Sequence, residues 1–225
     1  MKSLAVAVNK GGVGKTTTCK TIATAAAAAG LNVLLLDMDT QQNSTKWGRR
    51  RAEFQKLDMP IVRFTTENDL ADEIKKAEAA GCDLVVIDTP PGRSSEAPAA
   101  VDSVDLIIIP CIAEDVDSFD GIPKTARLAR LAGKPAAGLL NCATPGGKWQ
   151  VETARAVMEV VGIPMAPVVL HRLKEHRDAN PKGLTAQEFE PGSRAAEEVA
   201  ALWKWICAEL QISTNAHMHI EKGAA

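Results

Sequence analysis

The chain has 225 residues, of which 46% are apolar and 24% are charged, and its formal net charge is −2. This length and balance predict one large globular domain with a substantial core, and the small net charge excludes a polycation, so any contact with nucleic acid must come from a local basic patch. The four Phe, four Trp and absence of Tyr argue against a platform that stacks single-stranded bases.

The cysteines and the apolar runs indicate the compartment. The five cysteines are scattered, odd in number and never in C-x-x-C spacing, so we interpret them as small buried residues in a reducing environment. We find no N-terminal signal pattern and no apolar run near the ~18 residues of a membrane span. The sequence therefore predicts a soluble, cytoplasmic protein.

A glycine-rich stretch at residues 10–18, KGGVGKTTT, separates a short apolar run at 4–8 from an alanine-rich segment at 19–30. We expect a buried strand before it and a helix after it, which together are typical of a phosphate-binding P-loop. Loop N–H groups and the helix N-terminus would hold the phosphates, Lys15 would reach the β- and γ-phosphates, and Thr16 would ligate Mg²⁺. The predicted nucleotide-binding residues are Gly11, Gly12, Val13, Gly14, Lys15, Thr16 and Thr17.

An alternative for this loop is a dinucleotide-binding turn of the Rossmann type. The general P-loop motif has a glycine where this chain has Asn9. Asp37 or Asp39 would also suit the acid that follows a Rossmann loop by about 20 residues. However, the fingerprint G-x-G-x-x-G cannot be placed on residues 9–16, so we favour a nucleoside triphosphate.

Residues 32–36 predict a second buried strand, which ends at Asp37, Met38 and Asp39. A parallel βαβ unit would place the end of this strand beside the P-loop. Side chains alternate along an extended chain, so we expect only one of the two aspartates to point into the site. Residues 43–58, which include Trp47 and three consecutive arginines, predict a helix with a cationic solvated face.

Asp88 is the candidate metal-binding carboxylate. A strand at 61–64 and an amphipathic helix at 68–80 precede the apolar run 84–87, which ends at Asp88 and a Thr-Pro-Pro-Gly turn. This pattern is typical of a Walker B strand, whose aspartate holds Mg²⁺ through water. The alternative is an aspartate that only caps the following turn.

The second half of the chain continues the alternation of strands and helices. We expect strands at 106–110, 136–140 and 165–170, an acidic loop at 114–117 that leads into a helix to residue 131, and a helix at 149–161. A closing helix at 195–210 carries one apolar stripe, formed by Val199, Leu202, Trp203, Ile206 and Leu210. Asn141 ends the strand at 136–140 and is predicted to hydrogen-bond a purine base, although turn formation is an alternative role.

This order predicts an α/β fold with a mostly parallel twisted sheet and helices on both faces. One domain would span residues 1–210, and residues 211–225 would form a loose C-terminal tail.

Residues 171–194 are rich in basic and poor in apolar side chains. This segment is the richest candidate for a DNA-binding face, and the alternative is a solvated surface paired in part by its own acidic residues. The candidate DNA-binding residues are Arg172, Lys174, Arg177, Lys182 and Arg194.

With these motifs placed, residues 3–210 resemble the ParA/MinD family of deviant Walker ATPases, and most closely the short ParA-type partition proteins. The similarity is carried by residues 10–18, by DMDTQQNST at 37–45 and by DTPPG at 88–92, and residues 188–198 are similar to the family's C-terminal pattern. The resemblance implies a single-domain P-loop NTPase that uses ATP and Mg²⁺.

The resemblance also implies roles for two residues and a difference in one loop. Lys10 matches the signature lysine, which reaches across an ATP-sandwich dimer to the partner's nucleotide, and Asp39 matches the aspartate that positions the attacking water. Lys10, Lys15 and Asp39 are therefore the expected catalytic residues. Thr40 and Gln42 stand where the family usually has Pro and Gly, so the loop after Asp39 is expected to differ.

The leading functional hypothesis is a partition ATPase associated with the nucleoid. Its ATP dimer would bind DNA non-specifically and would be stimulated by a ParB-type centromere-binding partner to segregate plasmid or chromosome DNA; another cargo on the nucleoid is a related possibility.

Two other hypotheses come from different classes. A MinD-like membrane ATPase would end in a basic amphipathic helix, but residues 211–225 offer one Lys, one Glu and little apolar face, so no stable membrane association is expected. A reductase of the nitrogenase iron-protein type would need cysteine pairs, and here Cys111 stands alone.

Overall fold

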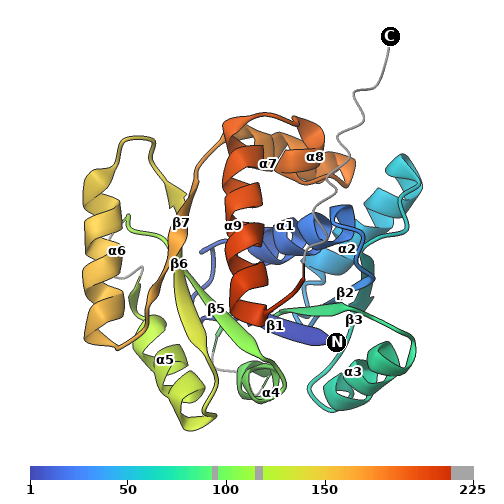
Figure 1. Cartoon of the computed structure of the whole chain (residues 1–225), viewed down its shortest axis with the longest axis horizontal. Helices are drawn as coiled ribbons and strands as arrows, with labels where there is room; N and C mark the ends of the chain where they lie inside the picture. The colour runs from blue at the N-terminus through green and yellow to red at the C-terminus, as the bar shows by residue number, and fades with distance from the viewer. Residues whose placement is uncertain (93–95, 115–118, 214–225) are drawn as a thin grey trace.

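A computed structural model describes residues 1–92, 96–114 and 119–213 of the chain (Figure 1). The described residues form one seven-stranded parallel sheet in the order β3-β2-β4-β1-β5-β6-β7. The strands are β1 (Lys2–Val6), β2 (Val33–Asp37), β3 (Ile61–Phe64), β4 (Leu84–Asp88), β5 (Leu106–Cys111), β6 (Ala136–Ala143) and β7 (Met165–His171). The predicted parallel α/β fold is confirmed.

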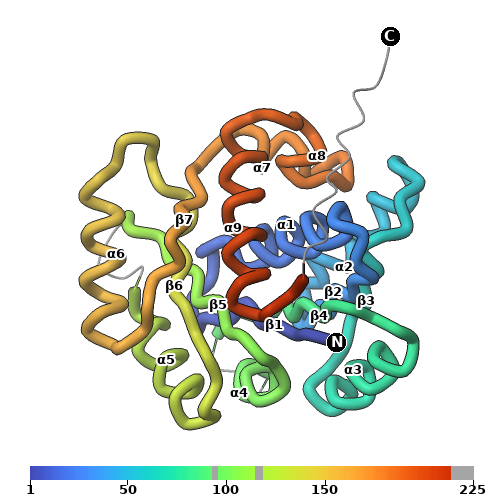
Figure 2. Tube along the Cα trace, in the orientation of Figure 1, coloured from blue at the N-terminus to red at the C-terminus, as the bar shows by residue number. Residues whose placement is uncertain are grey.

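Helices connect the strands and cover both faces of the sheet (Figure 1). The helical segments are α1 (Lys15–Ala28), α2 (Asn43–Arg50), η1 (Arg51–Gln55), α3 (Leu70–Ala79), α4 (Glu96–Asp102), α5 (Ile122–Leu131), α6 (Lys148–Val160), α7 (Lys174–Ala179), η3 (Asn180–Lys182), α8 (Ala186–Phe189) and α9 (Arg194–Leu210). Figure 2 follows the chain through them and shows α9, the last helix, beside α1, the first.

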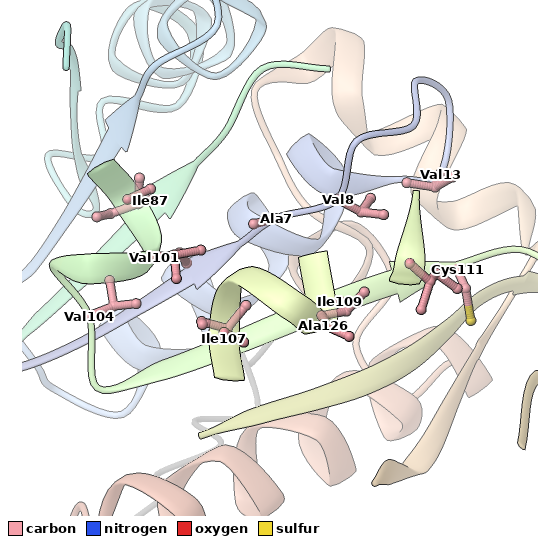
Figure 3. Packing of buried hydrophobic residues seen from close by; sticks show 14 of the residues in the cluster. Ala7, Val8, Val13, Ile87, Val101, Val104, Ile107, Ile109, Cys111 and Ala126 are labelled. Carbon is pink, nitrogen blue, oxygen red and sulfur yellow. The ribbon is translucent and has the colours of Figure 1, made fainter. Parts of the chain in front are cut away.

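The hydrophobic core consists of two clusters, one on each face of the sheet. Alternate residues of β1 supply both, since Leu4 and Val6 pack under α1, α2 and α9, whereas Ala5 packs under α3 to α6. Figure 3 shows the cluster that contains Ala5 from close by; Ile87 of β4 and Ile107 and Ile109 of β5, the two strands that flank β1, are among its residues. Strands buried on both faces are what covered parallel sheets require.

The order of the strands was not predicted from the sequence. β2 does not lie directly beside β1, because β4 is inserted between them and pairs with both. In this register Asp88 lies opposite Val6 on one side and opposite Asp37 on the other. The end of the Walker B strand, rather than that of β2, is therefore the immediate neighbour of the strand that leads into the P-loop.

Several element boundaries also differ from the sequence-based expectation. α1 begins at Lys15 instead of residue 19. The predicted helix at 43–58 is an α-helix that continues as the π-helical turn η1 and ends at Gln55. α4, α7 and α8 were not predicted, and the last two fall in the basic segment 171–194.

α9 follows the prediction for residues 195–210, and its five predicted stripe residues, Val199, Leu202, Trp203, Ile206 and Leu210, are buried. Two other predictions concern residues outside the described part: most of the acidic loop at 114–117, and the tail at 211–225 from residue 214 onward. Among the described helices, none has the length and apolar character that crossing a membrane requires.

Candidate functional site

The P-loop runs from the end of β1 into α1, and its last glycine is the N-cap of that helix. Gly14 has φ 88°, in the left-handed region, and no side chain caps the first turn. A Cβ at this position would lie 2.9 Å from Asn141 Nδ2, so both the backbone conformation and the close approach favour glycine. The uncapped N–H groups of the first turn suit an anion, with the helix dipole adding to the attraction.

Asn141, at the end of β6, supports this loop. Its Nδ2 donates to the Val13 carbonyl at 3.0 Å and to Thr18 Oγ1 at 3.0 Å. Both donor hydrogens are thereby used inside the protein, whereas Oδ1 is buried and has no partner. A contact between Asn141 and a purine base stays a prediction, and the structure adds a role in holding the P-loop.

Lys15 folds back onto its own loop. Its Nζ donates to the Lys10 carbonyl at 2.6 Å, and the side chain is 7% exposed. Burial lowers the pKa of Lys15, and the nearby charges of Asp88 and Asp39 oppose that shift. A cation that is desolvated and already flanked by carboxylates is suited to meet the charge of a phosphate.

Asp88 ends β4 across from the P-loop and is 1% exposed. Its Oδ2 accepts a hydrogen bond from Ser44 Oγ at 2.8 Å, while its Oδ1 is buried without a partner. Burial raises the pKa of Asp88 to about 6, against the opposing hydrogen bonds of Ser44 and Thr16. The orphaned carboxylate oxygen next to the Thr16 hydroxyl fits a hard divalent cation that takes oxygen ligands.

The two aspartates after β2 have different surroundings. Asp37 is fully buried and accepts hydrogen bonds from Thr45 N at 2.8 Å, Thr45 Oγ1 at 2.9 Å and Asp39 N at 3.1 Å. It therefore fixes the start of α2. Asp39 accepts from Gln41 N at 2.8 Å and lies near enough to act on the charge of Lys15, so Asp39 is the one that faces the P-loop lysine.

The loop after Asp39 adopts a glycine-like conformation without a glycine. Gln42, the N-cap of α2, has φ 54° and ψ 41°. A left-handed residue other than glycine costs roughly 1–2 kcal/mol. The backbone conformation that glycine favours is thus present at Gln42, where the sequence differs from the family pattern.

A cavity of about 490 Å³ opens beside the P-loop, between the first turn of α1, the ends of β6 and β7, and helices α2 and α7. Gly14, Thr16 and Asn141 line it, and so do Arg172 and Arg177. Two of the five residues predicted to bind DNA thus face the space next to the P-loop. Arg172 also pairs with Glu114, and Arg177 Nε donates to Asp178 Oδ1 at 2.8 Å.

The other three candidate DNA-binding residues do not line this cavity. Lys174 is exposed at the start of α7. Lys182 Nζ lies 4.4 Å from the centre of the Phe189 ring, and Arg194 Nε donates to Glu198 Oε1 at 2.8 Å. The basic segment 171–194 is therefore divided between the cavity and the outer surface.

Sequence reasoning missed two polar residues of this region. Ser44, which donates to Asp88, lies inside the stretch 37–45 that resembles the family but was given no role of its own. Lys20 stands in the alanine-rich helix α1, is 7% exposed and lines the cavity. Lysine in such a helix gives no local signal of burial, because its direction depends on how α1 packs.

We expect Lys20 to reduce stability at neutral pH. Burial, with a smaller contribution from the charge of Arg50, lowers the pKa of Lys20 from its ordinary 10.5 to about 8, against the opposing charges of Asp88 and Asp37. Cys19 on α1 and His176 on α7 are its other titratable neighbours. Because the folded state holds this proton less tightly than the unfolded state, stability rises as pH increases from about 8 toward 10.5, by on the order of 3 kcal/mol.

The measurement compares denaturant midpoints of the wild type and Lys20→Met from neutral to alkaline pH. The variant should be at least as stable as the wild type at neutral pH and should lack this alkaline gain. Equal pH dependence in both proteins would contradict the assignment.

Comparisons with known proteins agree with this geometry. A family model described as the CobQ/CobB/MinD/ParA nucleotide binding domain matches residues 4–202. The maintenance of carboxysome distribution protein A of Gloeobacter kilaueensis is 31% identical over 208 residues, which cover 92% of this chain and 93% of that protein. The chromosome partitioning protein ParA of Caulobacter vibrioides is 39% identical over 89 residues, or 39% of this chain and 33% of that one.

Solved structures show the same fold. The cell division ATPase MinD of Pyrococcus furiosus has a TM-score of 0.75 at 18% identity, covering 91% of this chain and 98% of its own. The ATP complex of a Cyanothece McdA variant has a TM-score of 0.72 at 17% identity, covering 96% and 99%. At these identities the similarity establishes the fold alone.

Proposed function

The chain belongs to the CobQ/CobB/MinD/ParA family of nucleotide-binding domains, and we propose that it is a Mg²⁺-dependent ATPase of the ParA type. The observation that carries this proposal is the arrangement around Lys15, a desolvated lysine at an uncapped helix N-terminus with Asp39 and Asp88 close by. The buried Oδ1 of Asp88, which has no hydrogen-bond partner, completes this arrangement. Such a site has a cradle for phosphates, a place for a cation and a free carboxylate for water.

Each residue of the site has a role in this proposal. The loop N–H groups and Lys15 bind and orient the phosphates of ATP, and Thr16 and Asp88 would hold Mg²⁺. The ion, when bound, would supply positive charge that neutralises the phosphates. Asp39 orients the attacking water and accepts its proton. For Lys15 to bind the phosphates, its Nζ must leave the Lys10 carbonyl and turn to the nucleotide.

We further propose that ATP joins two copies of the chain into a sandwich dimer. Lys10 is half-buried, and among the described residues its side chain makes no hydrogen bond or ion pair that would hold it in place. A second lysine beside the phosphates is useful where two charged nucleotides face one another. In the dimer Lys10 would reach the nucleotide of the partner copy.

The proposed dimer binds DNA without sequence preference, associates with the nucleoid in the cytoplasm and is stimulated by a partner protein. With ParA-type relatives, the cargo would be a plasmid or chromosome bound by a ParB-type protein. The Gloeobacter relative matches nearly full length and is named for carboxysome distribution, which supports another large cargo as the alternative. ATPase rates with and without DNA, and with the product of a neighbouring gene, test this proposal.

DNA retention tests where the nucleic acid binds. Lys174→Glu and Lys182→Glu change exposed cations outside the cavity, so they should weaken retention of any sequence in the ATP state and leave ATP binding unchanged. Each lost phosphate contact should reduce the slope of log affinity against log salt by about 0.9. Arg172 and Arg177 are less suitable, because substituting a residue that lines the cavity would mix effects on DNA and nucleotide.

The matched control is Lys124→Glu on α5, which covers the opposite face of the sheet. Filter or gel retention is measured with ATP, with ADP and without nucleotide over a salt series. Equal retention in the three states would contradict the dimer switch. Wild-type retention by both Glu variants would place the DNA on another surface.

A further inference from the structure

The cavity beside the P-loop carries positive charge that ATP itself does not require. Five Lys or Arg residues line it, and none of the lining residues is Asp or Glu. The P-loop already supplies the groups that bind a triphosphate, and the adenosine part of the nucleotide is neutral. Among the described residues, three of the lining cations take part in no ion pair: Lys20, Lys46 and Arg50.

Two of these cations converge on one residue at the inner wall. Lys20 Nζ lies 3.3 Å from Asn180 Oδ1, and Arg50 Nη2 lies 3.5 Å from the Asn180 carbonyl. Lys20 is 93% buried, since its exposed fraction is 7%. Two cations that share a neutral partner repel one another, and Arg50 adds to the effect of burial on Lys20, against the charges of Asp88 and Asp37.

Buried nitrogen atoms at the same wall lack partners. Arg50 Nε and His176 Nε2 are both buried and make no hydrogen bond in the structure. His176 lines the cavity together with Lys20, and the two also share a smaller pocket with Asn180 behind it. Burying polar groups without partners is unfavourable, so their gathering at one place favours the binding of an anion.

A packing role for Lys20 would explain fewer of these observations than an anion site does. Lys20 packs over the Trp47 ring at 5.7 Å from its centre, and a lysine that served only this packing would be replaced by methionine without loss of binding. It would not explain why Arg50 and His176 leave nitrogen atoms unpaired at the same wall.

We propose that Lys20, Arg50 and His176 form an anion subsite that takes a phosphate group other than those held by the P-loop. The compact charge and several acceptor oxygens of a phosphate match donors arriving from α1, α2 and α7. This phosphate is either a second phosphate attached to the ribose of a bound nucleotide or a free phosphate ion. The subsite goes beyond the proposed ATPase and requires neither hydrolysis nor DNA.

Calorimetric titration separates these two sources. Inorganic phosphate is titrated into protein saturated with Mg²⁺ and ADP, so that the P-loop is occupied. In parallel, the affinity for adenosine 3′,5′-bisphosphate is compared with that for AMP. Binding of phosphate on top of ADP would assign a free ion, and tighter binding of the bisphosphate than of AMP would assign a ribose phosphate.

The variants are Lys20→Met and Arg50→Gln, with Lys124→Met on α5 as the control. Each subsite variant should weaken the phosphate-dependent binding by roughly tenfold or more, the scale of one charge-assisted hydrogen bond, when that binding is compared with the same variant's affinity for ADP or AMP. The control should match the wild type. If Lys20→Met did not fold, Arg50→Gln would still provide the test.

The proposal is overturned if neither probe binds the wild type through a second phosphate, or if both variants bind it as the wild type does. ADP affinity is measured on the same samples, so failure to bind ADP would count against the nucleotide function. In that case phosphate titrated into Lys15→Met protein still tests the subsite, because the P-loop then lacks its lysine.

Discussion

Lys15→Ala abolishes ATP binding at concentrations that saturate the wild type, with an expected loss of affinity of roughly 100-fold or more, the scale of one strong charge-assisted contact in a desolvated site. In the structure this lysine is the buried cation of the P-loop, close enough to Asp88 and Asp39 for the charges of both carboxylates to raise its pKa against the effect of burial. Without it, the phosphates of ATP would face two negative charges with no fixed counter-charge. Equilibrium titration with a fluorescent ATP analogue measures the loss.

Lys15 also holds the loop, because its Nζ donates to the Lys10 carbonyl, so the experiment must separate charge from loop shape. Lys15→Met keeps most of the side-chain volume and should lose ATP as completely as Lys15→Ala. The denaturant midpoints of both variants should stay close to that of the wild type, since a buried lysine carries its own desolvation cost. Wild-type affinity in either variant would show that this loop is not the nucleotide site.

The sequence predicted the parts of the fold that local patterns determine. Every strand coincides with an apolar run recognised in advance, and α9 follows its stripe of buried residues. The start of α1 was placed four residues too late, because Lys15 to Thr18 continue a glycine loop and have no apolar periodicity. Their helical conformation follows from the turn at Gly14 and from the support of Asn141.

Strand order and short helices depend on distant contacts, and there the sequence failed. Nothing local indicates that β4 inserts between β1 and β2. α7 and α8 have six and four residues, too few to show a periodic apolar face. They form where α8 packs against α1, as the hydrogen bond from Gln187 Nε2 to the Thr21 carbonyl at 3.1 Å shows.

In the site, too, motifs identified the residues, whereas the directions of other side chains depend on the surrounding fold. Motifs pointed to Lys15, Thr16 and Asp88, and the structure brings their charges and hydroxyls together. The basic segment was treated as one surface, yet Arg172 and Arg177 turn to the cavity. A run of charges in a sequence does not specify the direction of each side chain, which is set by the ends of β7 and α7.

Asp39→Ala should still bind ATP and form the ATP dimer, but turn over at least roughly 100-fold more slowly, the scale of losing one general base. Asp39 is 8% exposed, and among the described residues its carboxylate accepts one hydrogen bond, at Oδ1 from Gln41 N at 2.8 Å. Its removal takes a negative charge away from Lys15 and the phosphates, so ATP affinity should be equal to or higher than that of the wild type.

Asp39→Asn is the matched variant, because its amide oxygen can keep the bond to Gln41 N while the charge and the proton acceptor are lost. It should be as slow as Asp39→Ala if the carboxylate does the chemistry, and near the wild type if Asp39 only shapes the loop. Asp37→Ala should have the opposite pattern of effects. It removes three buried hydrogen bonds at the start of α2, so it should lower stability more than it changes turnover.

Phosphate release measures turnover, and light scattering with ATP reports the trapped dimer. An Asp39→Ala protein that hydrolyses ATP at the normal rate would remove Asp39 from the chemistry. One that stays monomeric with ATP bound would show that dimer formation depends on Asp39, and would also contradict the proposed role. Slow turnover with a persistent dimer is the result that the free carboxylate beside Lys15 leads us to expect.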